Sequence, residues 1–255
     1  MNNWEKAVEK FIGKWERNKE VIGALVCGSF VTGNPTKHSD IDLHIILSDK
    51  VTWCERGNVI IDGFLIEYFC NSSKQIKKYF EEDYKEGTDM SFNQFLTGKI
   101  IFDKKDRIKD LKKIARKFKN KSFIKLDKTS IELQKYELWD NLDNTIDNSK
   151  KNSIDFYFIY YFTLKKIYNT YTKHLQYPFT SVDKTYMTLK SKKARTKYLM
   201  KDFPDKKFIK LFTNAIKKSR KSIMLNNLKL LTKHVHNKMG GFKINGWKLR
   251  TSVDV

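Results

Sequence analysis

The stretch Gly28-Ser-Phe-Val-Thr-Gly-Asn-Pro-Thr-Lys-His-Ser-Asp-Ile-Asp-Leu-His44 decides how this chain is interpreted, because it combines a glycine turn with a closely spaced pair of aspartates. The apolar run Val21–Cys27 leads into it, and the apolar run Leu43–Leu47 continues from it. Short apolar runs bounded by turn residues predict buried strands. We therefore expect two strands joined by a turn, with the aspartates at the start of the second strand.

The two aspartates, Asp40 and Asp42, are expected to act together. Side chains at positions i and i+2 of a strand share a face, about 6–7 Å apart along the chain. Divalent cations can offset the repulsion of two such carboxylates. The turn at Gly28 and Ser29 offers backbone N–H groups and a hydroxyl to an anion, with no Cβ at Gly28 to block close approach. Either half alone is more often a solvated turn, but together they have the parts that metal-assisted phosphoryl or nucleotidyl transfer requires.

These residues resemble the nucleotidyltransferase superfamily that includes DNA polymerase β. Its pattern is a hydrophobic residue, Gly-Ser or Gly-Gly, a short helix, and a strand carrying Asp-x-Asp or Asp-x-Glu. The matching residues here are Cys27-Gly28-Ser29, Gly33 within the connection, and Ser39-Asp40-Ile41-Asp42-Leu43. The resemblance implies that Gly28 and Ser29 bind the phosphates of a nucleoside triphosphate. It also implies that Asp40 and Asp42 hold two Mg²⁺ ions roughly 3.5–4 Å apart.

The superfamily also implies a third carboxylate on a neighbouring strand, and Glu67 is the candidate. The apolar runs Asn58–Ile61 and Phe64–Cys70 are joined by Asp62-Gly63, a strong hairpin signal. Glu67 is the only charge within residues 64–69, and a carboxylate among apolar neighbours needs a cation or hydrogen-bond donors. The alternative is a salt bridge to one of the many lysines or an edge-strand charge. Relatives more often carry Asp at this position, so the longer Glu has to be accommodated.

The cysteines and the apolar runs indicate in which kind of environment the protein works. The chain has 255 residues, enough for one large or two modest domains, and three cysteines without metal-ligand spacing. An odd number of cysteines without a signal peptide indicates a reducing compartment, so we expect a cytoplasmic protein. No run approaches 18 uninterrupted apolar residues, so no membrane segment is expected.

The formal charge of +22 raises the question of nucleic acid. Only seven of the 51 basic residues are arginine, the residue best suited to bidentate phosphate recognition. We therefore do not favour a dedicated nucleic-acid binder and expect most lysines to cover solvated faces.

The hydrophobic pattern predicts an α+β fold, with a domain of strands and helices over residues 1–120 and an all-α helical bundle over residues 121–255. The resemblance implies that the first is a mixed-sheet nucleotidyltransferase domain. Strands are expected over residues 21–27, 41–47, 58–61, 64–70 and 99–102. Helices are expected over residues 3–19, 29–33 in part, 72–84, 88–97, 104–119, 127–149, 152–176, 184–200 and 205–238. In the bundle, an aromatic stripe of Tyr157, Tyr160, Tyr161, Leu164 and Tyr168 is expected to be core. Phe242 and Trp247 of the tail can dock on the bundle.

This plan resembles the bacterial aminoglycoside and lincosamide nucleotidyltransferases over about residues 20–103. That resemblance implies an antibiotic-resistance enzyme that moves a nucleoside monophosphate, with ATP as the expected donor, to a hydroxyl of a small molecule. The alternatives are a nucleotidyltransferase whose acceptor is a protein or an RNA, and a non-catalytic module that retains the fold. The three carboxylates favour catalysis over the last.

The general base stays open. The acidic candidates lie on the first bundle helix, where three of them (Glu132, Asp140 and Asp143) can share a face; the full set is Glu132, Glu137, Asp140 and Asp143. His44 shares the strand face of Asp42, and we expect a core histidine rather than a neighbour of the metal. His234 and His236, two apart on a helix, have poor metal geometry and receive no role.

Overall fold

The computed structural model describes residues 2–151 and 153–251. The chain divides into two compact units. The first contains the chain up to Ser122 together with Lys197–Leu199, and the second contains Phe123–Thr196 and the chain from Met200 onward. The fold is α+β with a mixed sheet followed by helices, which confirms the expected class.

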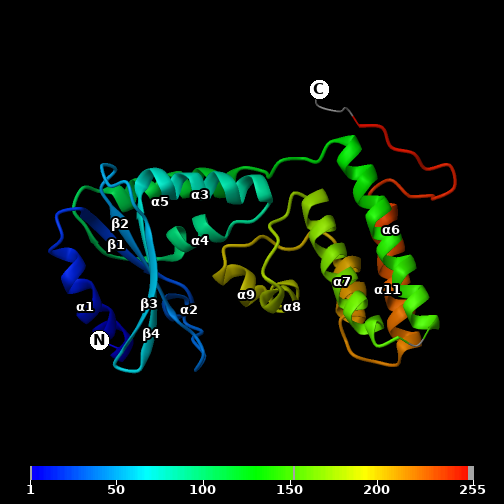
Figure 1. The fold of residues 1–255 in the computed structure, drawn as a ribbon, viewed down its shortest axis with the longest axis horizontal. Helices are drawn as coiled ribbons and strands as arrows, with labels where there is room; N and C mark the ends of the chain where they lie inside the picture. Colours follow the sequence, from blue (N-terminus) through cyan, green and yellow to red (C-terminus); the bar gives the residue numbers. More distant parts are fainter. Residues whose placement is uncertain (1, 152, 252–255) are drawn as a thin grey trace. The chain divides into compact units, whose positions relative to one another are not determined.

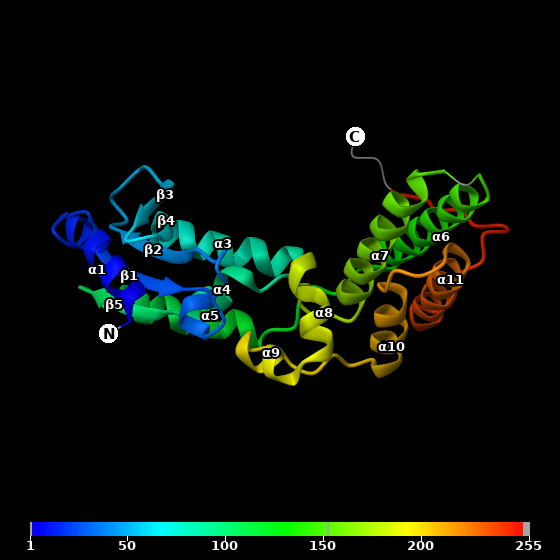
Figure 2. The ribbon, with the colours of Figure 1, turned by 90° about the horizontal axis from the view of Figure 1, so that it is seen from below.

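The first unit is built on a five-stranded sheet (Figure 1), and the labels of Figure 2 follow its strand order, β3-β4-β2-β1-β5. Its strands are β1 (Val21–Cys27), β2 (Ile41–Leu47), β3 (Glu55–Ile61), β4 (Phe64–Ser72) and β5 (Lys99–Asp103). β2 and β4 pair in parallel, and the other neighbours pair antiparallel. The strand expected at residues 58–61 starts earlier, because the polar residues before Asn58 also pair with β4.

Helices cover both faces of the sheet. They are α1 (Asn3–Glu16), α2 (Ser29–Thr32), α3 (Ser73–Glu86), α4 (Met90–Thr97) and α5 (Arg107–Asn120). Val8, Phe11 and Ile12 of α1 pack in one core cluster with alternate residues of β1 and β2, Ala24 and Leu43 among them. α3, α4 and α5 contact the sheet through β4, β1 and β5.

The second unit consists of helices, and both views show α6, α7 and α11 lying side by side (Figures 1 and 2). The helices after residue 122 are α6 (Lys128–Lys150), α7 (Asp155–His174), α8 (Val182–Lys190), α9 (Lys192–Lys197), α10 (Lys206–Ala215) and α11 (Lys221–Lys238). Residue 152, where we expected α7 to begin, lies outside the described residues. Among the described residues, none of the helices is both long enough and apolar enough to cross a membrane.

Two stretches that we expected to be single helices each contain two helices in the structure. The stretch 184–200 breaks at Ser191, whose hydroxyl accepts a hydrogen bond from the backbone N–H of Ala194 and so starts α9. The stretch 205–238 breaks between α10 and α11, where Ile216 is followed by a polar run over residues 217–220 that has no apolar residue to bury. The Tyr160 hydroxyl lies at this break, 2.7 Å from the carbonyl oxygen of Ala215 and 3.1 Å from that of Met224.

The aromatic stripe of α7 is only partly core. Tyr160, Leu164 and Tyr168 are buried, whereas Tyr157 and Tyr161 are 38% and 40% exposed. The expectation was wrong for these two tyrosines, because a helix packed mainly against one neighbour, here α6, buries one stripe of its surface rather than all of it.

Two other sequence features find partners inside the second unit. Trp247 stacks on Tyr136 with ring centroids 4.3 Å apart, so the tail docks as expected. His234 Nε2 lies 2.7 Å from Asp205 Oδ2, which also accepts a hydrogen bond from the Tyr171 hydroxyl at 2.6 Å. Burial opposes ionisation of Asp205, but the hydrogen bonds from Tyr171, the Phe208 N–H and His234 lower the pKa of Asp205 to about 2.

Candidate active site

The parallel pairing of β2 with β4 brings the three expected carboxylates together. Asp42 lies directly opposite Glu67 in the register of these strands, and Asp40 immediately precedes β2. One oxygen from each of the three side chains lies within 4.8 Å of the others. All three residues are half-buried, so the cluster is open to solvent on one side.

Gly28 touches this cluster directly. It follows β1, whose last residue, Cys27, pairs with Asp42. A Cβ at Gly28 would lie only 1.9 Å from Asp42 Oδ2, and the backbone there has φ +78° and ψ −158°, a conformation that is essentially restricted to glycine. We expected Gly28 to leave room for a phosphate. The structure shows that it first leaves room for the carboxylate of Asp42.

Ser29 is the first residue of α2. The carbonyl oxygen of Gly28 accepts hydrogen bonds from the backbone N–H and the hydroxyl of Thr32, which close this single turn. The first N–H groups of a helix have no acceptor within the helix. Here those N–H groups follow directly after Gly28 and therefore start beside Asp42. Gly33 ends the turn in the left-handed conformation with φ +81°.

The charges of the cluster affect its neighbours. Burial, and then the negative charges of Asp42 and Asp40, raise the pKa of the Cys27 thiol well above its usual value. Glu67 Oε1 accepts hydrogen bonds from Arg56 Nη2 at 2.6 Å and from Arg56 Nε at 2.9 Å. The alternative interpretation of Glu67 as a salt-bridge partner is thus confirmed, with an arginine in place of the expected lysine. Its role as a metal ligand stays a prediction.

Arg56 was missed by the sequence analysis. It precedes the expected strand 58–61, and its guanidinium lies over the ring of Phe69 at 5.0 Å. A diagonal contact across an antiparallel pair can be found only when the register is known. The single sequence signal was its type, since arginine is rare in this chain.

His44 is a core residue, as expected. It is buried between the rings of Phe69 and Phe95, and its Nε2 lies 3.2 Å from Gln94 Oε1. Its Nδ1 is buried and has no hydrogen-bond partner in the described part of the chain. Burial lowers the pKa of His44 to about 4, so it is neutral at pH 7.

The acidic candidates of α6 have partners within the second unit. Glu132 pairs with Lys135 at 2.5 Å, Glu137 pairs with Lys166 at 2.8 Å, and Asp140 accepts a hydrogen bond from Asn144 at 3.3 Å. These contacts account for three of the four carboxylates. None of the four is singled out as a general base.

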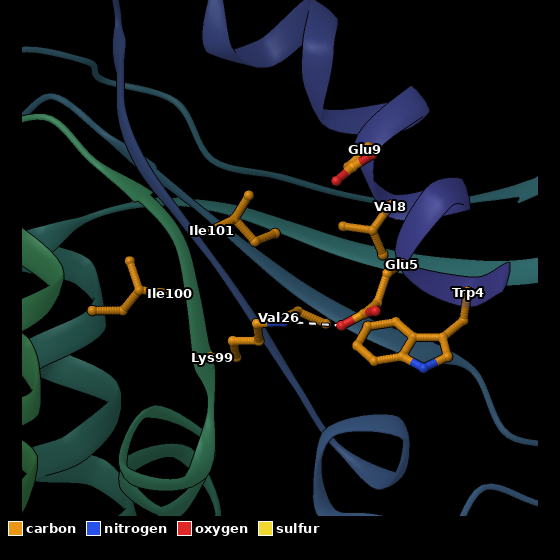
Figure 3. A pocket seen from close by; sticks show the side chains of 8 residues that line it. All are labelled: Trp4, Glu5, Val8, Glu9, Val26, Lys99, Ile100 and Ile101. Carbon is orange, nitrogen blue, oxygen red and sulfur yellow. Dashed lines mark hydrogen bonds and ion pairs between the residues drawn. The ribbon is translucent and has the colours of Figure 1, made fainter. Parts of the chain in front are cut away.

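One cavity of the first unit lies away from the carboxylates. It has a volume of about 240 Å³, and its lining residues come from α1, β1 and β5 (Figure 3). Val26, which lines it, belongs to the core cluster on the α1 face of the sheet, whereas its strand neighbour Cys27 pairs with Asp42. Glu5 and Lys99 form an ion pair of 2.9 Å across this cavity. We therefore do not assign the cavity to the chemistry of Asp40 and Asp42.

The carboxylate cluster fits a divalent cation by its donor set. Carboxylate oxygens are the ligands that Mg²⁺ prefers, usually one or two from the protein with the rest from water and substrate phosphates. Three carboxylate oxygens within 4.8 Å of one another, open on one side, match that requirement. A helix start next to the cluster adds N–H donors suited to an anion.

A comparison with protein families agrees with this geometry. Residues 9–107 match the family described as polymerase beta, nucleotidyltransferase. A nucleotidyltransferase-like protein from Exiguobacterium sibiricum is similar in structure, with 15% sequence identity, a TM-score of 0.46, and coverage of 93% of this chain and 78% of its own. A sequence comparison with curated proteins gives no match. The matched segment contains every strand of the sheet, so residues 9–107 form a nucleotidyltransferase domain of the polymerase beta family.

Proposed function

We propose that this protein transfers a nucleoside monophosphate from a nucleoside triphosphate, with ATP as the expected donor, to a hydroxyl group of a small molecule. The observation that carries the proposal is the convergence of the Asp40, Asp42 and Glu67 carboxylates beside Gly28. In the reaction, the acceptor hydroxyl gives up its proton to the solvent, and its oxygen forms a bond to the α-phosphorus. The bond from that phosphorus to the bridging oxygen breaks, and pyrophosphate leaves with the electron pair.

Each residue of the site has a defined task in this proposal. The Gly28 N–H and Ser29 bind the terminal phosphates, since these donors lie at the start of α2. Asp40 and Asp42 would hold two Mg²⁺ ions, and Glu67 would complete the one nearer the acceptor. When bound, these ions supply charge neutralisation of the phosphates and activation of the attacking hydroxyl. Arg56 fixes Oε1 of Glu67 by two hydrogen bonds and so restricts the orientation of its carboxylate.

The test is a transfer assay with purified protein. Each of the four nucleoside triphosphates is supplied with Mg²⁺ and a panel of hydroxylated small molecules, starting with aminoglycosides and lincosamides. Product is detected as the mass gain of one nucleoside monophosphate. Asp42→Asn is expected to lower the rate by at least about 100-fold, because loss of a metal ligand removes several kcal/mol of transition-state stabilisation. Its melting temperature should stay near that of the wild type or rise, because a like-charge repulsion is relieved.

Asp62→Asn is the matched control for this experiment. Asp62 lies in the β3–β4 turn, where it pairs with Lys10 at 2.6 Å, and both side chains are largely exposed. An exposed ion pair of this kind contributes about 0–1 kcal/mol. The control should therefore keep its rate. An Asp42→Asn variant that turns over as fast as Asp62→Asn would show that the site is assigned wrongly.

The second candidate function is transfer to a macromolecule, an RNA or a protein. The net charge of +22 favours an RNA acceptor. Transfer of label to RNA, with small molecules unmodified, would establish this alternative. Binding to RNA should then weaken by orders of magnitude between about 50 and 200 mM salt.

A further inference from the structure

The carboxylates lie on one face of the sheet, beside three strands whose register is known: β2, β4 and β3. Asp42 of β2 lies opposite Glu67 of β4, which lies opposite Asn58 of β3. Asp40 lies two residues before Asp42 and begins the next row of residues across these strands. In that row, Leu65 of β4 lies opposite Ile60 of β3. Since residues two apart on a strand share a face, Leu65 and Ile60 lie on the same face as Glu67 and Asn58.

The order of the strands gives this surface two sides. Gly28 and α2 follow β1, which borders β2 on one side; β4 borders β2 on the other side, and β3 lies beyond β4. The proposed phosphate donors therefore lie on the β1 side of the aspartates. A molecule that attacks the α-phosphorus in line must approach from the side opposite the leaving pyrophosphate. That places the acceptor on the side of β4 and β3.

The residues on the acceptor side are apolar and exposed. Ile60 is 72% exposed and Leu65 is 41% exposed, although they lie opposite each other beside a polar cluster. On the other face of the same strands, Val59 and Ile66 pack into the core cluster. The core accounts for that other face, but it does not account for Ile60 and Leu65. Exposed apolar side chains next to a reacting centre indicate contact with a ligand.

We propose that Ile60 and Leu65 form an acceptor subsite that selects an amphipathic small molecule, one with a hydroxyl for transfer and an apolar group for these two side chains. The inference rests on the proposed function and narrows its acceptor class. Asn58, which is exposed and lies between this pair and Arg56 on the same face of β3, provides a polar group opposite Glu67.

The charge on this side of the cluster disfavours a polycationic acceptor. The guanidinium-bearing side chain of Arg56 is 68% exposed and belongs to the same face of β3 as Asn58 and Ile60. It already neutralises part of the charge of Glu67. A polycation would therefore meet a positive group where an aminoglycoside site needs negative ones, and it would cover Ile60 and Leu65 with charged groups.

The test compares ligands that share their hydroxyls and differ in apolar length. Wild-type protein carrying ¹³C-labelled Ile and Leu methyl groups is titrated, with Mg²⁺ and a non-hydrolysable triphosphate analogue present. The probes are methyl glucoside, hexyl glucoside and kanamycin. Hexyl glucoside is expected to shift the methyl resonances of Ile60 and Leu65 and to bind at least about tenfold more tightly than methyl glucoside, because each buried methylene adds affinity. Kanamycin should leave these methyl groups unaffected.

Variants identify the subsite. The double change Ile60→Ser with Leu65→Ser should abolish the advantage of hexyl over methyl glucoside and leave the affinity for the triphosphate analogue unchanged. Ile124→Ser is the control, since Ile124 is an apolar side chain of similar exposure, 55%, outside the sheet. Both Ile60 and Leu65 are exposed, so the double variant is expected to fold.

The outcomes separate this inference from the proposed function. Nucleotide transfer to a small molecule without a response of the two methyl groups, or with equal preference for kanamycin, overturns the subsite and leaves the function standing. A response to hexyl glucoside in a protein that transfers nucleotide only to RNA or protein supports the subsite as a binding site and overturns the function. If the protein shows neither nucleotide transfer to a small molecule nor a response of the two methyl groups, the proposed function and the subsite are both overturned.

Discussion

Replacing Gly28 by alanine is the sharpest perturbation that the site offers. The new Cβ would lie 1.9 Å from Asp42 Oδ2, a distance that real Cβ contacts do not show. The carboxylate of Asp42 must therefore move away by roughly 1 Å, since contacts under 3.0 Å are not tolerated. The backbone at this position is also strained for any residue with a Cβ, at a cost of about 1–3 kcal/mol.

The backbone strain and the displacement of the Asp42 carboxylate predict losses of different quantities. The backbone strain lowers the free energy of unfolding, and rotating the Asp42 side chain out of its well adds about 0.5–1.5 kcal/mol. The displacement of one carboxylate from the cluster affects the reaction itself. A misplacement of about 1 Å in a catalytic group can lower the rate by about 100-fold. We expect Gly28→Ala to lose at least that much activity and to bind Mn²⁺ more weakly, with a melting temperature lower by several degrees.

Gly33→Ala separates strain from displacement. Gly33 has a similarly positive φ of +81°, but a Cβ there would have no atom within 4 Å. This control should lose about 1–2 kcal/mol of stability through the left-handed backbone alone and keep its metal affinity. Thermal melting, Mn²⁺ titration and the nucleotide transfer rate are measured on both variants. If Gly28→Ala binds Mn²⁺ and turns over like Gly33→Ala, the contact between Gly28 and Asp42 has no part in the site.

Two further predictions concern Glu67 and His44. Glu67→Gln should slow metal-dependent transfer in single-turnover experiments, because Glu67 is proposed to serve the acceptor side. The affinity for the triphosphate should stay near that of the wild type. A variant that loses stability but keeps its rate would mean that the residue is only the partner of Arg56. The pKa of His44 is about 4 in the folded protein, against an ordinary value of 6.5. The unfolded chain therefore binds the proton first as the pH falls from 6.5 to 4, and the free energy of unfolding declines by up to about 3 kcal/mol. The melting temperature of His44→Gln should fall less over this pH range than that of the wild type, and equal slopes would show that His44 does not carry the effect.

Much of the sheet was predictable from the sequence because its residues obey local rules. The strands at Val21–Cys27 and Ile41–Leu47 were expected with the bounds that the structure has. The turn at Asp62-Gly63 fixed the register that places Glu67 opposite Asn58. The convergence of the three carboxylates followed from spacing, from this hairpin and from the resemblance to a known superfamily.

What could not be predicted depends on contacts between distant residues. The hydrogen bonds of Arg56 to Glu67 cross two strands diagonally, and the contact of Gly28 with Asp42 depends on how closely β1 approaches β2. Neither distance follows from sequence spacing. In the second unit, the helix breaks at Ser191 and after Ala215 carry no glycine or proline, so the periodic pattern ran through them.

The parallel pairing of β2 with β4 has a consequence for the synthesis of the protein. A growing chain that has completed β1 and β2 already carries Asp40 and Asp42, but Glu67 joins them only after the β3–β4 hairpin has formed and β4 has paired with β2. Under the proposed function, a divalent cation binds the chain more tightly once β4 has paired with β2. Relative to a form without affinity for the cation, such binding stabilises the paired strands by RT ln(1 + [L]/Kd), about 2.7 kcal/mol at a concentration of 100 times Kd. Magnesium would then act during biosynthesis as a selective ligand for chains in which β4 has paired with β2.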